Sequence, residues 1–142
     1  MEENKKGIFM NKIKSRIHFY DCDPAGIIFF ANIYKIAHDA LEELFLLKYI
    51  DFNKYKDFTM PIVHSEADYK YPLRFNDEVE ISMFLEDIGE HSFCFVYEIY
   101  NITAQKLSAI VKVRHVLVEK KTFQKVQLFN ELKEILKNFW LL

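Results

Sequence analysis

Alternation of apolar and polar residues with a period of two runs through most of this chain. It begins at residues 13–20 and returns at 63–75, 79–85, 93–99 and 107–113. Because successive side chains of a strand point to opposite faces, each run predicts a strand with one buried face. The last four runs follow one another directly, with Asn76-Asp77 as the first turn, so they predict a hairpin that continues as an antiparallel meander.

Two segments show a helical period instead. Apolar residues recur every three or four positions from Ile33 to Phe45 without glycine or proline, which predicts an amphipathic helix with Asn32 at its N-cap. The same spacing at 128–139 predicts a closing helix, and the aromatic stretch 49–58 predicts a short helix between them. A strand, a helix, four strands and a last helix form an α+β domain, in which one central helix covers the apolar face of the sheet.

The size and composition fit one globular domain. The chain has 142 residues and 17.1 kDa, with 51% hydrophobic and 28% charged residues, a balance that supports a sizeable core. We expect one domain over 1–142, with residues 1–11, which lack any period, as a frayed lead-in. Because about five strands around one helix leave strand edges free, and 16% of the residues are aromatic, we also expect a homodimer or homotetramer.

Several functional classes do not fit this composition. Three glycines and three prolines exclude Gly-rich phosphate loops, and a net charge of −2 offers no field for nucleic acid. The longest apolar run, Ile27 to Ala31, is far shorter than the ~20 residues of a membrane span. The two cysteines, Cys22 and Cys94, are too few for a disulfide framework and favour a reducing cytoplasm. The five histidines lack metal-ligand spacing, so we expect neither a metal nor a cofactor.

The turn after the first strand carries the strongest candidate for chemistry. Asp21 and Asp23 lie two residues apart, and Pro24 and Gly26 stiffen the turn that follows. The start of the predicted helix presents unpaired backbone N–H groups, which attract negative charge. A carboxylate beside such donors offers both a base or nucleophile and an oxyanion site, the two requirements of acyl transfer. Turn formation and helix capping are the alternative role of such an aspartate pair.

The segment 19–32, FYDCDPAGIIFFAN, resembles the signature of hotdog-fold thioesterases of the 4-hydroxybenzoyl-CoA thioesterase family. The resemblance continues through 60–63 and 71–79 and extends from Ile13 to about Glu119. It implies a hotdog fold, in which a curved antiparallel sheet of about five strands wraps around a long central helix. It also implies that two subunits join their sheets and that each active site lies at their interface.

The same resemblance implies an acyl-CoA thioesterase, which hydrolyses an acyl-CoA or aryl-CoA to a carboxylic acid and free CoA. CoA is part of the substrate, so no cofactor is implied. Asp23 is the implied nucleophile or general base, Asp21 becomes structural, and the Phe30 amide polarises the thioester carbonyl. The implied contributors to the oxyanion or substrate site are Gly26, Asn32 and His64. For His64, an ordinary surface histidine is the alternative.

Two other functions stay open from the sequence. A catalytically idle acyl-binding hotdog protein would bind its ligand without turnover, although the intact Asp23 counts against it. A hotdog hydratase or dehydratase would need a histidine coupled to the acid in the same loop. No histidine lies between Asp23 and His38, so this second alternative is the weaker one.

Overall fold

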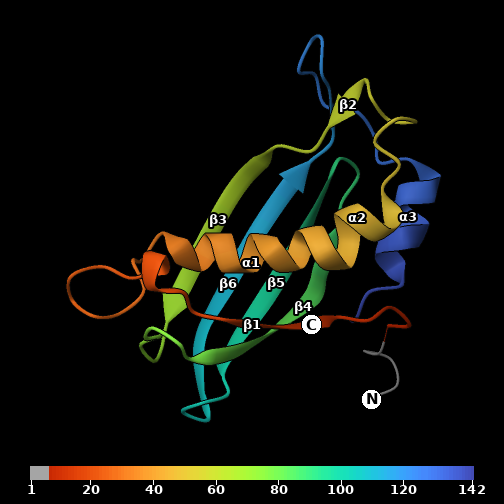
Figure 1. Ribbon diagram of the computed structural model, residues 1–142. Helices are drawn as coiled ribbons and strands as arrows, with labels where there is room; N and C mark the ends of the chain where they lie inside the picture. Colours follow the sequence, from red (N-terminus) through yellow and green to blue (C-terminus); the bar gives the residue numbers. More distant parts are fainter. Residues whose placement is uncertain (1–6) are drawn as a thin grey trace.

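The computed structural model describes residues 7–142, and a five-stranded antiparallel sheet lies at its centre. The strand order is β1-β4-β5-β6-β3, and a helix crosses one face of the sheet (Figure 1). The strands are β1 (Lys12–Arg16), β3 (Ile62–Tyr69), β4 (Glu78–Ile88), β5 (Ser92–Asn101) and β6 (Lys106–Val116). A separate short ladder joins β2 (Phe58–Thr59) to β7 (Val118–Glu119). The α+β class predicted from the pattern is confirmed.

The crossing helix is a continuous helical segment of 18 residues. It consists of α1 (Asn32–Leu41), a π-helical turn at Glu42–Leu46, and α2 (Leu47–Tyr49). Its position and its buried apolar face agree with the predicted spacing, but 18 residues span only about 27 Å, so the helix is shorter than the long helix we expected. The closing helix is confirmed as α3 (Asn130–Lys137), which packs beside β4.

The place of β3 in the sheet corrects the predicted hairpin. β3 pairs with β6, with Ala67 opposite Val111, whereas β4 pairs with β1 and β5. The physical reason lies in residues 70–77, which are too many for a hairpin loop of 2–5 residues and include Pro72. The Asn76 amide in this connection donates to the Ile17 carbonyl at 2.8 Å, which fixes the connection to the end of β1 instead. Only β4, β5 and β6 form the meander.

Two further predicted elements differ from the structure. The first strand stops at Arg16, and Phe19–Asp21 form a 3-10 turn. The aromatic stretch 49–58 holds turns instead of a helix of its own. The Asp51 carboxylate accepts hydrogen bonds from the amides of Asn53 and Lys54 at 3.1 and 3.0 Å, so the side chain stabilises a turn in competition with a helix.

Residues 7–11 are held in place, so the expectation of a frayed N-terminal segment is wrong for these residues. Asn11 is buried and its amide donates to the Met83 carbonyl at 3.2 Å. The Phe9 ring stacks on Tyr49 with 4.0 Å between ring centroids. These contacts tie the segment to β4 and to the end of α2. The remainder of the expected lead-in, residues 1–6, lies outside the described residues.

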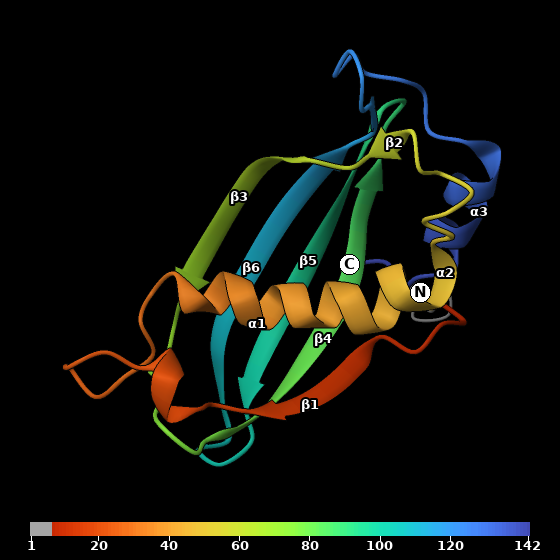
Figure 2. The same ribbon diagram turned by 45° about the horizontal axis from the view of Figure 1, so that its top comes forward.

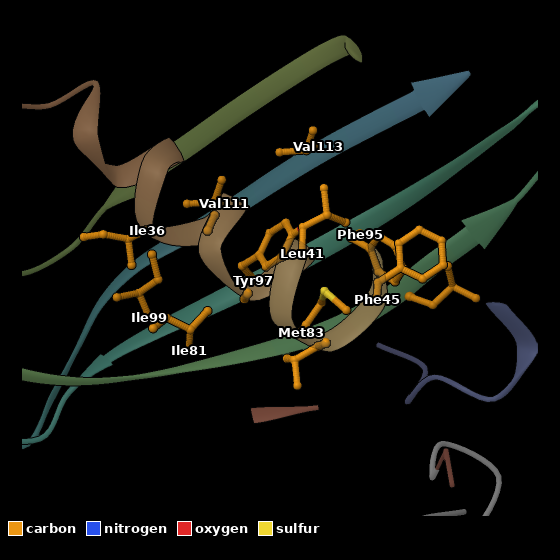
Figure 3. Close-up of a cluster of buried hydrophobic side chains, with 14 of the residues drawn as sticks. Ile36, Leu41, Phe45, Ile81, Met83, Phe95, Tyr97, Ile99, Val111 and Val113 are labelled. Carbon is orange, nitrogen blue, oxygen red and sulfur yellow. The ribbon is translucent and has the colours of Figure 1, made fainter. Parts of the chain in front are cut away.

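One aromatic ring joins the helix to both the sheet and the C-terminal segment. Phe45 is fully buried, and its centroid lies 6.0 Å from Phe93, 5.5 Å from Phe95 and 5.7 Å from Phe139, all edge to face. Such arrangements add about 0.5–1.5 kcal/mol per pair to the burial of the rings. Figure 3 shows Phe45 and Leu41 beside Phe95 and the other side chains of the inner sheet face. Phe93 and Phe95 are buried, which agrees with the one buried face predicted for the run 93–99.

We predict that Phe45→Ala lowers the free energy of unfolding by about 3–5 kcal/mol, because the cavity it leaves borders three rings that relax only partly. Urea unfolding followed by circular dichroism measures this loss. Phe123→Ala is the matched control, since Phe123 is 62% exposed and its removal should change the free energy by less than about 0.5 kcal/mol. Equal losses in the two variants would contradict the assigned core.

Candidate active site

Asp21 anchors the loop that precedes α1. Its side chain is only 2% exposed, and its Oδ2 accepts a hydrogen bond from the His18 amide at 2.9 Å. Lys35, on the first turns of α1, places its Nζ 3.3 Å from Oδ1. The Asp21 carbonyl accepts from the Phe29 amide at 2.9 Å. These contacts give Asp21 the structural role implied by the resemblance.

Asp23 occupies the next turn, and its backbone is fixed on both sides. Its amide donates to the Ile27 carbonyl at 3.0 Å, and its carbonyl accepts from the Gly26 amide at 2.9 Å. The Asp23 Oδ1 atom accepts from the Ala25 amide at 2.9 Å, whereas Oδ2 has no hydrogen-bond partner among residues 7–142. One carboxylate oxygen is therefore held by the turn, and the other is unpaired within this part of the chain. Figures 1 and 2 show this loop projecting from the body of the domain.

Gly26 is needed for the shape of this turn. Its φ angle is +83°, in the left-handed region that side chains with a Cβ disfavour. An added Cβ would meet no atom within 4 Å, so the requirement for glycine comes from the backbone angle and not from crowding.

The start of α1 supplies a donor close to this turn. The Phe30 amide has no hydrogen-bond acceptor among residues 7–142, while the Phe30 carbonyl accepts from the Tyr69 hydroxyl at 2.6 Å. This position lies at the positive end of the helix dipole. Asn32 is not the N-cap that the pattern predicted, because the cap position falls on Ala31. The Asn32 side chain instead donates from Nδ2 to the Asp21 carbonyl at 2.9 Å, and so it joins the helix start to the anchored loop.

A cavity of about 490 Å³ lies beside the start of the helix. Phe30 and Ile33 line it from the helix side, and Tyr69, Pro72 and Leu73 line it from the segment at the end of β3. Asp23 is not among the residues that line this cavity. A single chain thus provides the helix start and an apolar hollow, with the carboxylate outside it.

His64 lies away from this place. Ala67 of β3 packs on the core, so His64, three residues earlier, faces the other side of the sheet. Its Nε2 is 2.8 Å from Glu66 Oε1 on that outer face. Five residues of strand, about 17 Å, separate His64 from Tyr69 at the helix start. The structure therefore does not bring His64 to Asp23 within one chain.

Cys22, next to the candidate carboxylate, is unsuited to act as a nucleophile. Burial raises the pKa of the Cys22 thiol, and the negative charges of Asp21 and Asp23 raise it further. A thiol with a raised pKa yields little thiolate, the reactive form. Cys22 packs against the core, as the sequence predicted.

His115 is a candidate residue that the sequence reasoning set aside. It is 5% exposed, and its Nδ1 lies 3.0 Å from the Met60 carbonyl. The buried Nε2 atom has no hydrogen-bond partner among the described residues. Its place in the alternating pattern points to it. His115 continues the odd-numbered, inward-facing positions of β6, where a polar residue is unusual.

Residues 7–142 contain neither a cluster of side chains placed to bind a metal nor a helix suited to cross a membrane. No group of three or more His, Cys, Asp and Glu side chains is placed to hold a metal ion in this part of the chain. Within the same residues, no helix combines the length and hydrophobicity that crossing a membrane requires.

In this chain a turn with two aspartates leads into a helix that crosses an antiparallel sheet. This combination is that of the hotdog-fold thioesterases. The Thioesterase-like superfamily matches residues 17–136, and the chain belongs to this family. The 1,4-dihydroxy-2-naphthoyl-CoA hydrolase of Crocosphaera subtropica is 32% identical over 116 residues, which cover 79% of this chain and 85% of that protein. The hydrolase of the same name from Nostoc punctiforme is 32% identical over 82% of this chain and 79% of its own.

Solved structures show the same fold. The 1,4-dihydroxy-2-naphthoyl-CoA thioesterase from Synechocystis superposes with a TM-score of 0.81 at 22% identity and covers 89% of this chain and 94% of its own. A gentisyl-coenzyme A thioesterase superposes with a TM-score of 0.75 at 22% identity, over 86% of this chain and 98% of its own. The α+β fold with a five-stranded antiparallel sheet, shared with these thioesterases, is thus confirmed, whereas the long central helix that the motif implied is not.

We predict that the two aspartates differ sharply in their effect on stability. Asp21→Asn should lower the free energy of unfolding by about 1–3 kcal/mol, because it removes the charge from a buried group that meets Lys35 and a backbone amide. Asp23→Asn should change it by less than about 0.5 kcal/mol, since one side of that carboxylate is unpaired. Urea unfolding of both variants tests the contrast, and a reversed order would refute the structural role of Asp21.

Proposed function

We propose that this thioester hydrolase cleaves an acyl-CoA to a carboxylic acid and free CoA, with Asp23 as its catalytic carboxylate. The observation that carries the proposal is that a free Asp23 oxygen and the unbonded Phe30 amide belong to one stiff loop at the helix start. The membership in the superfamily supports the reaction, and the names of the relatives support a CoA thioester as substrate.

In the proposed mechanism, the Phe30 amide hydrogen-bonds the thioester oxygen as negative charge develops on it. Asp23 acts in one of two ways. As a nucleophile it forms a mixed anhydride and expels CoA thiolate, after which water cleaves the anhydride. As a general base it takes a proton from water, whose oxygen then attacks the carbonyl carbon. Both routes consume one water and yield the acid and the thiol.

The neighbours of these two groups have supporting roles in the proposal. Gly26 provides the backbone angle that turns the loop toward the helix, and Asn32 ties the helix start to Asp21. They shape the oxyanion site without needing to touch the substrate. His64 faces the other side of the sheet and has no part in the site of its own chain. The reaction needs only water and the thioester, so we propose no metal and no cofactor.

We infer that the complete site needs a second copy of the chain. The loop with Asp23 projects outward, and Asp23 does not line the cavity beside the helix start. β3, at the edge of the sheet, offers eight residues that have no strand on their outer side among the described residues. Pairing of two β3 edges would continue the sheet across a homodimer and bring a partner surface to the loop.

We further propose that residues 1–142 form one domain and that it works in the cytoplasm. Residues 7–11 are tied to the sheet, and the superfamily match covers most of the remainder. Both cysteines are free, which suits a reducing compartment.

For catalysis, we predict that Asp23→Asn lowers the rate of thiol release at least about a hundredfold, measured with the acyl-CoA that the wild type hydrolyses fastest. The reason is that an amide neither attacks the thioester carbonyl nor takes a proton from water. A panel of short, long and aromatic acyl-CoAs with a thiol reagent provides the measurement. Asp51→Asn is the matched control, since the Asp51 carboxylate also accepts amides in a turn but lies far along the chain from the site. An unchanged rate in Asp23→Asn would exclude the assignment. Tight ligand binding without turnover in the wild type would favour the idle acyl-binding alternative.

For assembly, light scattering at micromolar concentration should give at least twice the monomer mass of 17.1 kDa. The expected reason is the free β3 edge, which a second copy covers. A monomer that retains full activity at this concentration would rule out a site shared between subunits.

A further inference from the structure

Three cavities follow one another along the central helix. The first, of about 460 Å³, begins at Tyr34 near the start of α1, and the second, of about 270 Å³, lies further along the helix beside Phe45 and Leu46. The third, of about 250 Å³, lies between the segment 50–60 and α3. The second and third are each smaller than the roughly 300–1,000 Å³ of an ordinary ligand site, so their use depends on whether they adjoin.

Shared side chains show that neighbouring cavities adjoin. The first and second cavities are both lined by His38, Leu41, Ile62 and His115. The second and third are both lined by Phe52, Thr59 and Met60. The first two cavities therefore form one groove between the helix and β3, which we call the α1–β3 groove. Thr59 and Met60 form the partition between this groove and the third cavity.

Met60 is the adaptable part of the partition. Its backbone is fixed, because its carbonyl lies 3.0 Å from Nδ1 of His115 and because the preceding residue, Thr59, pairs with Val118 in the β2–β7 ladder. Its side chain is half-buried and unbranched, and such a side chain changes rotamer to fit its neighbours. A movement of this side chain is therefore sufficient to join the groove to the third cavity.

The α1–β3 groove begins at the proposed oxyanion donor. Phe30, Tyr34 and His38 are four residues apart and so lie on one face of the helix, which Leu41 and Phe45 continue. Phe45 is about 22 Å beyond Phe30 along the helix. An extended hydrocarbon chain advances about 1.3 Å per carbon, because its bonds of about 1.5 Å form a zigzag. A chain held at Phe30 therefore needs about 16–18 carbons to reach the partition.

The third cavity has the lining of a hydrocarbon site. All the side chains around it are aliphatic or aromatic except Thr59 and Lys120, and Lys120 is exposed. The hydroxyl of Tyr55 is bound to Glu131, which does not line the cavity. A polar group placed there would lose its hydrogen bonds to water, whereas a methylene chain gains free energy from burial.

The first cavity is more polar, and it lies nearer to the proposed catalytic loop. Lys35, Asp39 and Glu42 line its helix side. Two of these charges have partners within the chain, since Lys35 Nζ lies 3.3 Å from Asp21 and Glu42 lies 3.7 Å from Nε2 of His38. The polarity of the lining thus falls from the catalytic loop toward α3, as the polarity of a fatty acyl thioester falls from its carbonyl to its methyl end.

We propose that the α1–β3 groove and the third cavity together hold the hydrocarbon chain of a long-chain acyl-CoA, with about 16–18 carbons. The inference rests on the proposed thioesterase function and names the acyl group that the site selects. The aromatic acyl groups in the names of the relatives are too short to reach the third cavity from Phe30.

The test measures kcat/KM for octanoyl-, hexadecanoyl- and octadecanoyl-CoA below their micelle concentrations. The wild type should prefer hexadecanoyl-CoA to octanoyl-CoA at least about tenfold, because each buried methylene group adds to binding. Thr59→Phe fills the end of the groove, so this preference should fall at least about fivefold. Met60→Ala widens the partition, so kcat/KM for octadecanoyl-CoA should rise at least about twofold relative to hexadecanoyl-CoA.

Thr122→Phe is the matched control, because it makes the same substitution at an exposed residue that lines none of the three cavities. Its preference should equal that of the wild type. Thermal unfolding of each variant identifies any that fails to fold, and if Thr59→Phe fails, Met60→Ala provides the test. Equal kcat/KM for the octanoyl and hexadecanoyl substrates in the wild type, or an unchanged preference in folded Thr59→Phe, would refute the long-chain site while the thioesterase stands. If no acyl-CoA is hydrolysed, the proposed function fails and this inference fails with it.

Discussion

The buried carboxylate of Asp21 is the constraint on which the site depends. It accepts a hydrogen bond from the His18 amide at the end of the first strand segment and meets Lys35 on the helix. The backbone carbonyl of Asp21 accepts hydrogen bonds from the Phe29 amide and from the Asn32 side chain. One residue thus joins the strand, the turn and the helix start. Because both Asp23 and Phe30 lie between these fixed points, the separation of carboxylate and amide is set by the chain itself and not by the substrate.

Much of the fold follows from local periodicity. The remainder depends on contacts between residues that are far apart in the sequence. Alternation placed β4, β5 and β6, and helical spacing placed the helix that begins near Ile33, because burial on one face imposes these periods. The edge position of β3 was not predictable in this way, since its alternating residues suit β4 as well as β6 as a neighbour. The choice is made by residues 70–77, which bind the end of β1 through Asn76.

The same division applies to the site. The sequence motif pointed to Asp23, Gly26 and Phe30, and the structure shows the rigid turn that these positions predicted, because such a turn is a local property. The catalytic roles of these residues stay predictions. The failure of Asn32 as an N-cap and the outward position of His64 depend on tertiary contacts, with Asp21 and with Glu66 respectively. His115 was overlooked for a related reason: it has no chemical neighbour in the sequence, and its meaning appears only when Met60, 55 residues away, takes one of its nitrogens.

The arrangement of the layers explains why the polar groups of interest gather on one side of the helix. Phe45 fixes the far end of the helix to the sheet and to Phe139 through edge-to-face contacts. Toward β3 the sheet ends, and no further strand of residues 7–142 continues it past that edge. The groove with His115 and the free edge of β3 are two results of this single boundary. The edge where the sheet stops is therefore also the place where we propose that a second copy of the chain pairs, because the backbone groups of β3 on that side have no strand to bind among residues 7–142.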